Sequence, residues 1–252
     1  MKTKYLFSAF VLLNLVLFSS LAKGDQNKTG WLWGIGALAD YHIYDDVGTR
    51  TFIGPYIGYK GEKFSFIGPE FRYKFYEKDG FRIAGQLSLL AWGHGYEEDD
   101  SSLFEGMEDR DFSFGPGIVL GYKTGPWDFE FNSAFDALNN SEGMELMAKA
   151  SYKFHLGSFS LKPMVALDYF DEDYMDYYYG VKASEATLAR PQFSADSSLN
   201  KVLGITLTTN EFFGGVTSLS VQNIWYDSDI EDSPLVDDDS NVRVLLSFTR
   251  FF

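Results

Sequence analysis

A chain of 252 residues with a formal net charge of -15 has no basic surface to neutralise nucleic-acid phosphates, so nucleic-acid binding is excluded as its function. The length fits a single domain, and because cysteine is absent we expect neither disulfides nor a lipoprotein anchor. Aromatic residues make up 18% of the chain, with 24 Phe and 16 Tyr, which is well above the usual aromatic content of soluble proteins.

The first residues have the order of a secretory signal peptide. Two lysines precede an apolar run over residues 5–17, and small residues follow up to Gly24. We expect cleavage after Ala22 or Gly24, which divides the chain into a signal peptide over 1–24 and an exported domain over 25–252. An uncleaved anchor helix is the weaker alternative, because the apolar run is shorter than the ~20 residues that span a bilayer.

The first half of the exported domain contains segments in which apolar or aromatic residues alternate with small or polar ones, as in β-strands with two different faces. These segments are 31–43, 51–60, 63–76 and 81–91. Pro55 marks an irregular or edge-like position in the second segment. Asp79-Gly80 predicts a two-residue hairpin turn, and the acidic segment 94–110 predicts a long loop.

The second half continues the alternation. Its predicted strands are 112–122, 127–135, 144–156, 159–169, 201–209, 215–227 and 241–252. The least regular part is 171–200, and a second acidic loop covers 228–240.

The last segment ends the chain in the middle of a strand, without a turn. One of its faces is apolar except for Arg250. The apolar side chains of that face are Val242, Val244, Leu246, Phe248 and Phe252. In a closed barrel such a strand pairs with the first strand, whereas in an open sheet it would be a pairing hazard. These residues also fit the alternative, an ordinary terminal strand of a soluble sandwich. The rest of the chain decides between the barrel and the sandwich.

The rest of the chain favours the membrane. Most of the predicted strands reach the ~9–11 residues that a tilted membrane strand needs, whereas strands of soluble proteins are nearer ~5–6. Backbone amides in hydrocarbon must be hydrogen-bonded, which only helices and closed barrels achieve. We therefore predict an all-β fold, a transmembrane antiparallel up-and-down β-barrel of about twelve strands. That count puts the loop 94–110 among the short turns, so either a strand near Pro55 or Pro69 is miscounted or the loop is unusual.

Several segments match one known family. They are WLWGIGALADY at 31–41, GPYIGYKGEKF at 54–64, YYYGV at 177–181, DSPLV at 232–236 and the terminal Phe. With them the chain resembles the MipA/OmpV family of outer-membrane proteins, the MltA-interacting proteins. The most specific positions are Tyr178, Tyr179, Gly180, Val181, Asp232, Ser233 and Pro234, which carry no assigned role. The chain departs from the family at Arg250, where an aromatic is common, in the strongly acidic 94–110 loop, and in having DDVGTR where the family has a glycine-rich loop.

The resemblance implies a protein of the cell outer membrane, in contact with lipid and lipopolysaccharide and without catalysis or cofactors. It also implies a scaffold that links a lytic transglycosylase to a murein synthase, while other members of the family are discussed as adhesins. The residues leave another class open, a small-solute channel, for which an acidic lumen would favour cations. An open pore and a barrel filled by side chains cannot be told apart at this level.

Three histidines are the candidates for catalysis, namely His42, His94 and His155. None is spaced from a serine in a way that indicates a nucleophile and its base, so we expect no enzyme and no lipid hydrolase.

Acidic runs at 97–100, 171–173 and 237–239 lack the spaced ligands and glycine of a calcium loop, so we expect solvated loops rather than metal sites. The tyrosine-rich segment 174–179 predicts an interfacial girdle, with a contact surface as the alternative.

Overall fold

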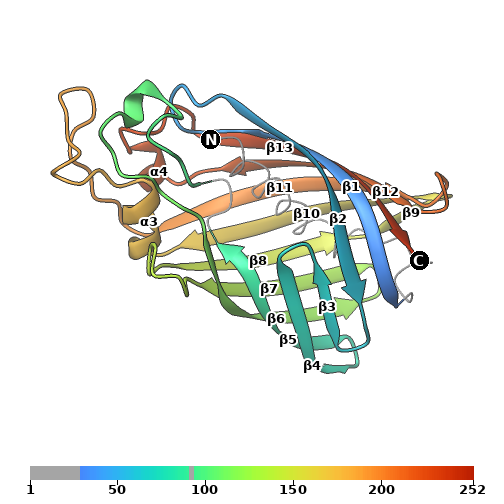
Figure 1. Ribbon diagram of the computed structural model, residues 1–252. Helices are drawn as coiled ribbons and strands as arrows, with labels where there is room; N and C mark the ends of the chain where they lie inside the picture. Colours follow the sequence, from blue (N-terminus) through green and yellow to red (C-terminus); the bar gives the residue numbers. More distant parts are fainter. Residues whose placement is uncertain (1–28, 91–93) are drawn as a thin grey trace.

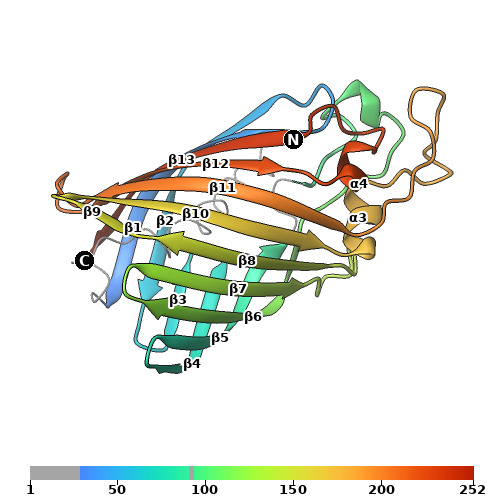
Figure 2. The same ribbon diagram turned by 180° about the vertical axis from the view of Figure 1, so that it is seen from behind.

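The computed structural model describes residues 29–90 and 94–252, so the predicted signal peptide over 1–24, with Ala22 and Gly24, lies outside the described residues. One antiparallel sheet curls into a closed barrel (Figures 1 and 2). Its strands are β1 Gly30–Tyr41, β2 Thr49–Lys60, β3 Phe64–Ile67, β4 Glu70–Lys78, β5 Phe81–Leu90, β6 Ser113–Thr124, β7 Trp127–Phe135, β8 Met144–Tyr152, β9 Phe154–Leu156, β10 Phe159–Phe170, β11 Ser198–Thr209, β12 Val216–Trp225 and β13 Ser240–Phe251.

The barrel closes between its first and last strands. Strand β13 pairs with β1 from Phe251 opposite Leu32 to Arg243 opposite Asp40. Strands β8 and β9 both pair with β10 and are separated only at Lys153, so they form one strand of the wall. The described wall therefore has twelve antiparallel strands, which confirms the predicted fold class.

The predicted single strand over 63–76 is wrong. The chain turns at Gly68-Pro69, so this segment forms two strands, β3 and β4, that pair with each other as a short hairpin. Gly68 has a φ of 56°, a left-handed conformation that glycine adopts without steric cost. The additional strand moves the acidic 94–110 loop to the end of the barrel that carries the other long loops, which resolves the conflict in the strand count.

The short hairpin leaves a seam in the wall. Strand β3 pairs with β2 only at Gly58–Lys60, and among the described residues the rest of β2 has a strand neighbour on one side only, β1. The Ile57 carbonyl accepts a hydrogen bond from Gly68 N (3.2 Å), so alternate residues of β2 direct their backbone groups toward the seam. Pro55 is the next of these and has no N–H to leave unpaired. Its predicted edge-like position is confirmed.

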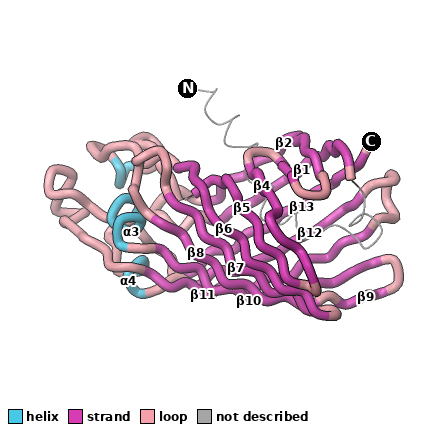
Figure 3. The backbone as a smooth tube through the Cα atoms, turned by 90° about the horizontal axis from the view of Figure 1, so that it is seen from below, coloured by secondary structure: helices cyan, strands magenta, loops and turns pink. Residues whose placement is uncertain are grey.

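The two ends of the barrel differ. Short turns, among them Asp79-Gly80 with both φ angles positive as predicted, lie at the end that holds the chain terminus Phe252 (Figure 1). Long loops lie at the other end, together with the short helices α3 Glu172–Tyr178 and α4 Ser228–Glu231 (Figure 3). In outer-membrane barrels short turns face the periplasm and long loops the exterior. No helix in the described part of the chain is long and apolar enough to cross a membrane.

The closing strands are packed tightly on the inner side at Gly34. The Tyr56 ring lies across this glycine, and its hydroxyl donates a hydrogen bond to the Phe248 carbonyl (3.2 Å). A Cβ at position 34 would lie 2.1 Å from the Tyr56 ring and 2.4 Å from the Phe248 oxygen. Such overpacking costs about 1–3 kcal/mol.

We therefore expect Gly34→Ala to lower the free energy of unfolding by that amount, measured by urea titration of the barrel in lipid vesicles. Ala37→Val, on the outer face of the same strand, is the control and should change little. Equal stability of Gly34→Ala and wild type would contradict the close packing.

Candidate functional site

Four segments pack over the loop end of the barrel, and we call them together the cap. They are 42–48, 94–112, 171–197 and 226–239. The cap has a hydrophobic core of its own, whose fully buried aromatic side chains include Tyr44, Phe104, Tyr174, Tyr178 and Tyr179. This core continues into the barrel, because it also contains the inward-facing Ala166, Val202 and Ile224 of β10, β11 and β12. The cap is therefore a packed layer with a buried core, and the acidic runs lie on its exposed side.

The tyrosine-rich segment forms the centre of the cap. Helix α3 begins at Asp171, whose side chain caps it by accepting a hydrogen bond from Tyr174 N (3.1 Å). The helix turns Tyr174 and Tyr178 into the core, where both are 0% exposed. The predicted interfacial girdle is wrong, because these rings face protein rather than lipid, and the alternative of a contact surface fails for the same reason.

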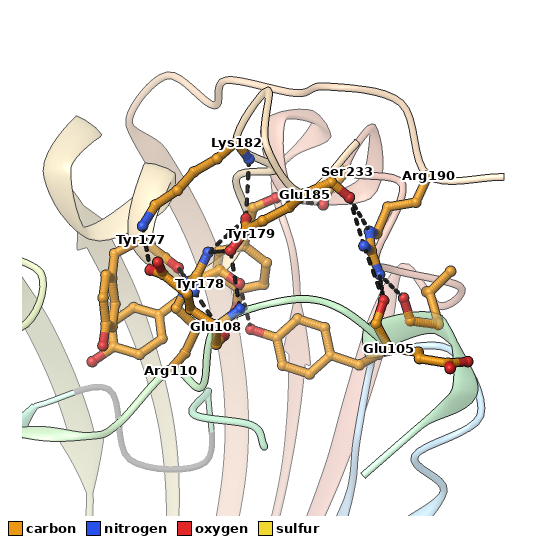
Figure 4. Close-up of polar contacts among 12 residues, drawn as sticks. Glu105, Glu108, Arg110, Tyr177, Tyr178, Tyr179, Lys182, Glu185, Arg190 and Ser233 are labelled. Atoms are coloured by element: carbon orange, nitrogen blue, oxygen red, sulfur yellow. Dashed lines mark hydrogen bonds and ion pairs between the residues drawn. The ribbon is translucent and has the colours of Figure 1, made fainter. Parts of the chain in front are cut away.

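A buried ion pair joins two loops of the cap. Arg110 is 2% exposed and makes a bidentate contact with Glu185, both distances being 2.9 Å (Figure 4). The same guanidinium donates to the backbone carbonyls of Tyr177 and Glu108, each at 2.7 Å. Burial by itself would raise the pKa of Glu185, but hydrogen bonds from Glu108 N, Arg110 and Lys182 N hold that pKa below its ordinary value. Glu185 is therefore ionised at neutral pH.

A second buried arginine ties the same loops together. Arg190 donates to the carbonyl oxygen of Glu185 (2.5 Å) and, across the cap, to those of Leu103 and Glu105 (Figure 4). Backbone carbonyls buried in a loop layer need such donors, since water cannot reach them. Arg110, Glu185 and Arg190 were not identified from the sequence, because the contacts of Arg110 with Glu185 and of Arg190 with Leu103 join segments that are distant along the chain.

The two family segments of unassigned role meet in the cap. The hydroxyl of Ser233 donates to the Tyr179 carbonyl (2.7 Å), and the Tyr44 hydroxyl donates to the Tyr178 carbonyl (2.9 Å). Val181 forms a two-residue bridge with Phe193. Of the flanking positions, Gly180 has the Asp176 carbonyl 2.2 Å from where a Cβ would lie, and Asp232 is the C-cap of α4. Pro234 follows the hydrogen-bonded Ser233.

Ser233→Ala should destabilise the cap by about 1–3 kcal/mol, because the buried Tyr179 carbonyl loses its donor. Hydrogen exchange of the α3 amides, measured on the folded protein, would detect this as faster opening. Ser228→Ala is the control, since Ser228 is exposed and its hydroxyl donates to Asp227 in its own turn. Equal exchange in the two variants would contradict the role given to Ser233.

The histidines do not form a catalytic group. His94 lies under the cap with its ring edge-on to Phe170 and Tyr179, His42 stacks on Tyr44 at 5.0 Å, and His155 is exposed in β9. No group of three or more His, Asp or Glu side chains in the described ranges is placed to hold a metal ion.

Burial, followed by the nearby charge of Arg243, lowers the pKa of His94 to about 3. An unfolded His94 has a pKa near ~6.5, so the unfolded state binds the proton first as the pH falls. The stability that neutral His94 contributes to the cap is therefore fully present above pH ~6.5. It falls as the pH drops toward 3, by at most about 1.4 kcal/mol per pH unit.

Thermal unfolding in detergent should accordingly occur at a lower temperature at pH 5 than at pH 7.5. In His94→Gln this difference should shrink. A His94→Gln variant with an unchanged pH profile would show that another group is responsible.

The inner wall of the barrel carries charges of both signs. Glu130 of β7 accepts from Arg82 (2.7 Å) and Lys149 (3.1 Å), with Arg72 at 3.6 Å. The acidic lumen considered for a cation channel is therefore not what this part of the wall shows. The excess of acidic residues lies in exposed loops, such as Glu97–Asp100.

Sequence comparison with known proteins identifies one family. The family model described as "MltA-interacting protein MipA" matches residues 33–252. The chain is 26% identical to outer membrane protein OmpV of Vibrio cholerae (90% of this chain, 92% of that protein) and 24% identical to outer membrane protein Omp26La of Vibrio anguillarum (90% and 92%). It is 24% identical to the MltA-interacting protein of Escherichia coli K12 (81% and 82%). Among solved structures, the COG4313 outer membrane channel from Pseudomonas putida F1 matches with a TM-score of 0.44 at 13% identity, covering 92% of this chain and 100% of that one.

Proposed function

Because the chain belongs to the MltA-interacting protein family, we propose that this outer-membrane barrel is a non-enzymatic scaffold that holds a lytic transglycosylase and links it to a murein synthase. The observation that carries the proposal is the extent of the match, which runs from residue 33 to the end and so includes both the barrel and its cap. A relative over most of its length is named for its interaction with MltA.

The periplasmic end offers a surface for such a partner. The turn between β11 and β12 presents Phe212 and Phe213, the latter 84% exposed and held at a positive φ of 53°. Aromatic side chains are enriched at protein interfaces, where they bury large areas with little loss of side-chain entropy. The murein layer lies on the periplasmic side, so this turn faces the compartment in which the enzymes work.

The test is binding of purified lytic transglycosylase to the full-length barrel in detergent, measured by surface plasmon resonance. We expect binding by the wild type and at least tenfold weaker binding by Phe212→Ser/Phe213→Ser. The control is Leu188→Ser, an equally exposed apolar residue at the opposite end, in the cap. Absence of binding by the wild type contradicts the proposal. Equal loss in both variants would place the partner elsewhere on the barrel.

A further inference from the structure

A partly open space lies in the barrel beneath the cap. Its volume is about 160 Å³, comparable with the ~150 Å³ of an engineered cavity that binds benzene. Its roof is made by His94, Phe170 and Tyr226, and its wall by the inward side chains of several strands. Its lining also includes Pro69 and Leu89, which lie beside the seam between β2 and β5, so the space reaches this interruption of the strand pairing.

Four of the wall residues stand in a row across adjacent strands. Asn132 of β7 is opposite Met147 of β8, Met147 is opposite Asp168 of β10, and Asp168 is opposite Asn200 of β11. All four line the space. Adjacent strands are about 4.8 Å apart, so the backbones at Asn132 and Asp168 are separated by about 10 Å, with the thioether of Met147 between them.

Two residues of this row, on either side of Met147, carry a buried acceptor without a partner in the described structure. The two atoms are Asn132 Oδ1 and Asp168 Oδ1. The orientation of Asn132 is fixed, because its amide nitrogen already donates to Glu130 (3.2 Å). Native proteins rarely leave buried polar atoms unpaired, and a bound molecule or water is one way in which such atoms are satisfied.

The charges of the lining favour a cation. Three carboxylates line the space, those of Glu70, Glu145 and Asp168, against two guanidinium groups, those of Arg72 and Arg243. Arg243 is also paired with Asp40 (3.1 Å). His94 is neutral at pH 7, since burial lowers its pKa to about 3, so it does not repel positive charge.

We propose that this space is a binding site for a small aliphatic amine that carries a second hydrogen-bond donor at the other end of its chain, such as an α,ω-diamine. The ammonium group donates to Asp168 Oδ1, the methylene chain lies on Met147, and the second donor reaches Asn132 Oδ1. This site is separate from the periplasmic surface proposed above, and neither depends on the other.

The test is isothermal titration of the full-length barrel in detergent with five-carbon compounds that differ only in their end groups. We expect 1,5-diaminopentane to bind most tightly, followed by pentylamine, with pentanol and pentanoate at least tenfold weaker. Equal binding of all four, or heat from none of them, would overturn the proposal and leave a cavity that holds only water.

Two variants locate the site. Asp168→Asn should weaken 1,5-diaminopentane at least tenfold and abolish its advantage over pentanol. Asp128→Asn is the matched control, since Asp128 faces Lys162 (3.7 Å) and does not line the space. This variant should bind 1,5-diaminopentane as tightly as wild type does. Folding of each variant is verified by the heat-dependent shift on electrophoresis. If Asp168→Asn does not fold, the comparison among the four compounds on wild type still decides. Unchanged affinity of folded Asp168→Asn would overturn the assignment.

Discussion

Arg110→Met should destabilise the cap by about 3–5 kcal/mol. The substitution leaves Glu185 ionised and buried without its bidentate partner, and it removes the donor from the Tyr177 and Glu108 carbonyls. Removing one member of a buried ion pair lowers the free energy of unfolding by far more than the intact pair contributes to it. The barrel wall does not depend on this contact, so the cap should open while the barrel stays folded.

Limited proteolysis of the folded protein, with the cleaved loops identified by mass spectrometry, measures this opening. We expect rapid cleavage within 94–112 and 171–197 in Arg110→Met and slow cleavage in wild type. Lys182→Met is the control. It breaks the exposed Lys182–Glu108 pair (2.6 Å), and exposed pairs contribute about 0–1 kcal/mol. Slow cleavage in Arg110→Met would show that the aromatic core holds the cap without the ion pair.

Leu203→Arg should lower the stability of the barrel in a bilayer by about 2–4 kcal/mol, the cost of a basic side chain on the lipid face at the membrane midplane. Leu203 is 52% exposed on the outer face of β11, at the middle of the strand. Its neighbour on β10, Val165, is also in the middle of its strand. The outer position and the depth together predict the effect.

The measurement is reversible unfolding by urea or guanidinium in lipid vesicles, followed by tryptophan fluorescence. Leu199→Arg on the same face, two pleat repeats closer to the loop end, is the control and should cost only about 0–1 kcal/mol. If both variants are equally stable in vesicles, the outer face of β11 does not contact the hydrocarbon core.

The tyrosine-rich segment shows where inference from sequence fails. Composition indicates that Tyr174, Tyr178 and Tyr179 avoid water, but lipid and protein interior are equally apolar surroundings. Only helix α3, which turns these rings toward Tyr44 and Phe104, decides between the two. The extended segment 63–76 fails for a related reason. Alternation of apolar and polar residues continues on both sides of Gly68-Pro69, so the pattern conceals the turn.

The sequence by itself determined the fold class and the face of nearly every strand, because side chains alternate with a period of two whichever strand lies alongside. It also determined the hairpin at Asp79-Gly80 and the family, through short local segments. The tertiary structure alone decided the cap, the meeting of Ser233 with Tyr179, the seam beside Pro55 and the row from Asn132 to Asn200. These features depend on strand register and on contacts between distant loops, and neither leaves a periodic signal along the chain.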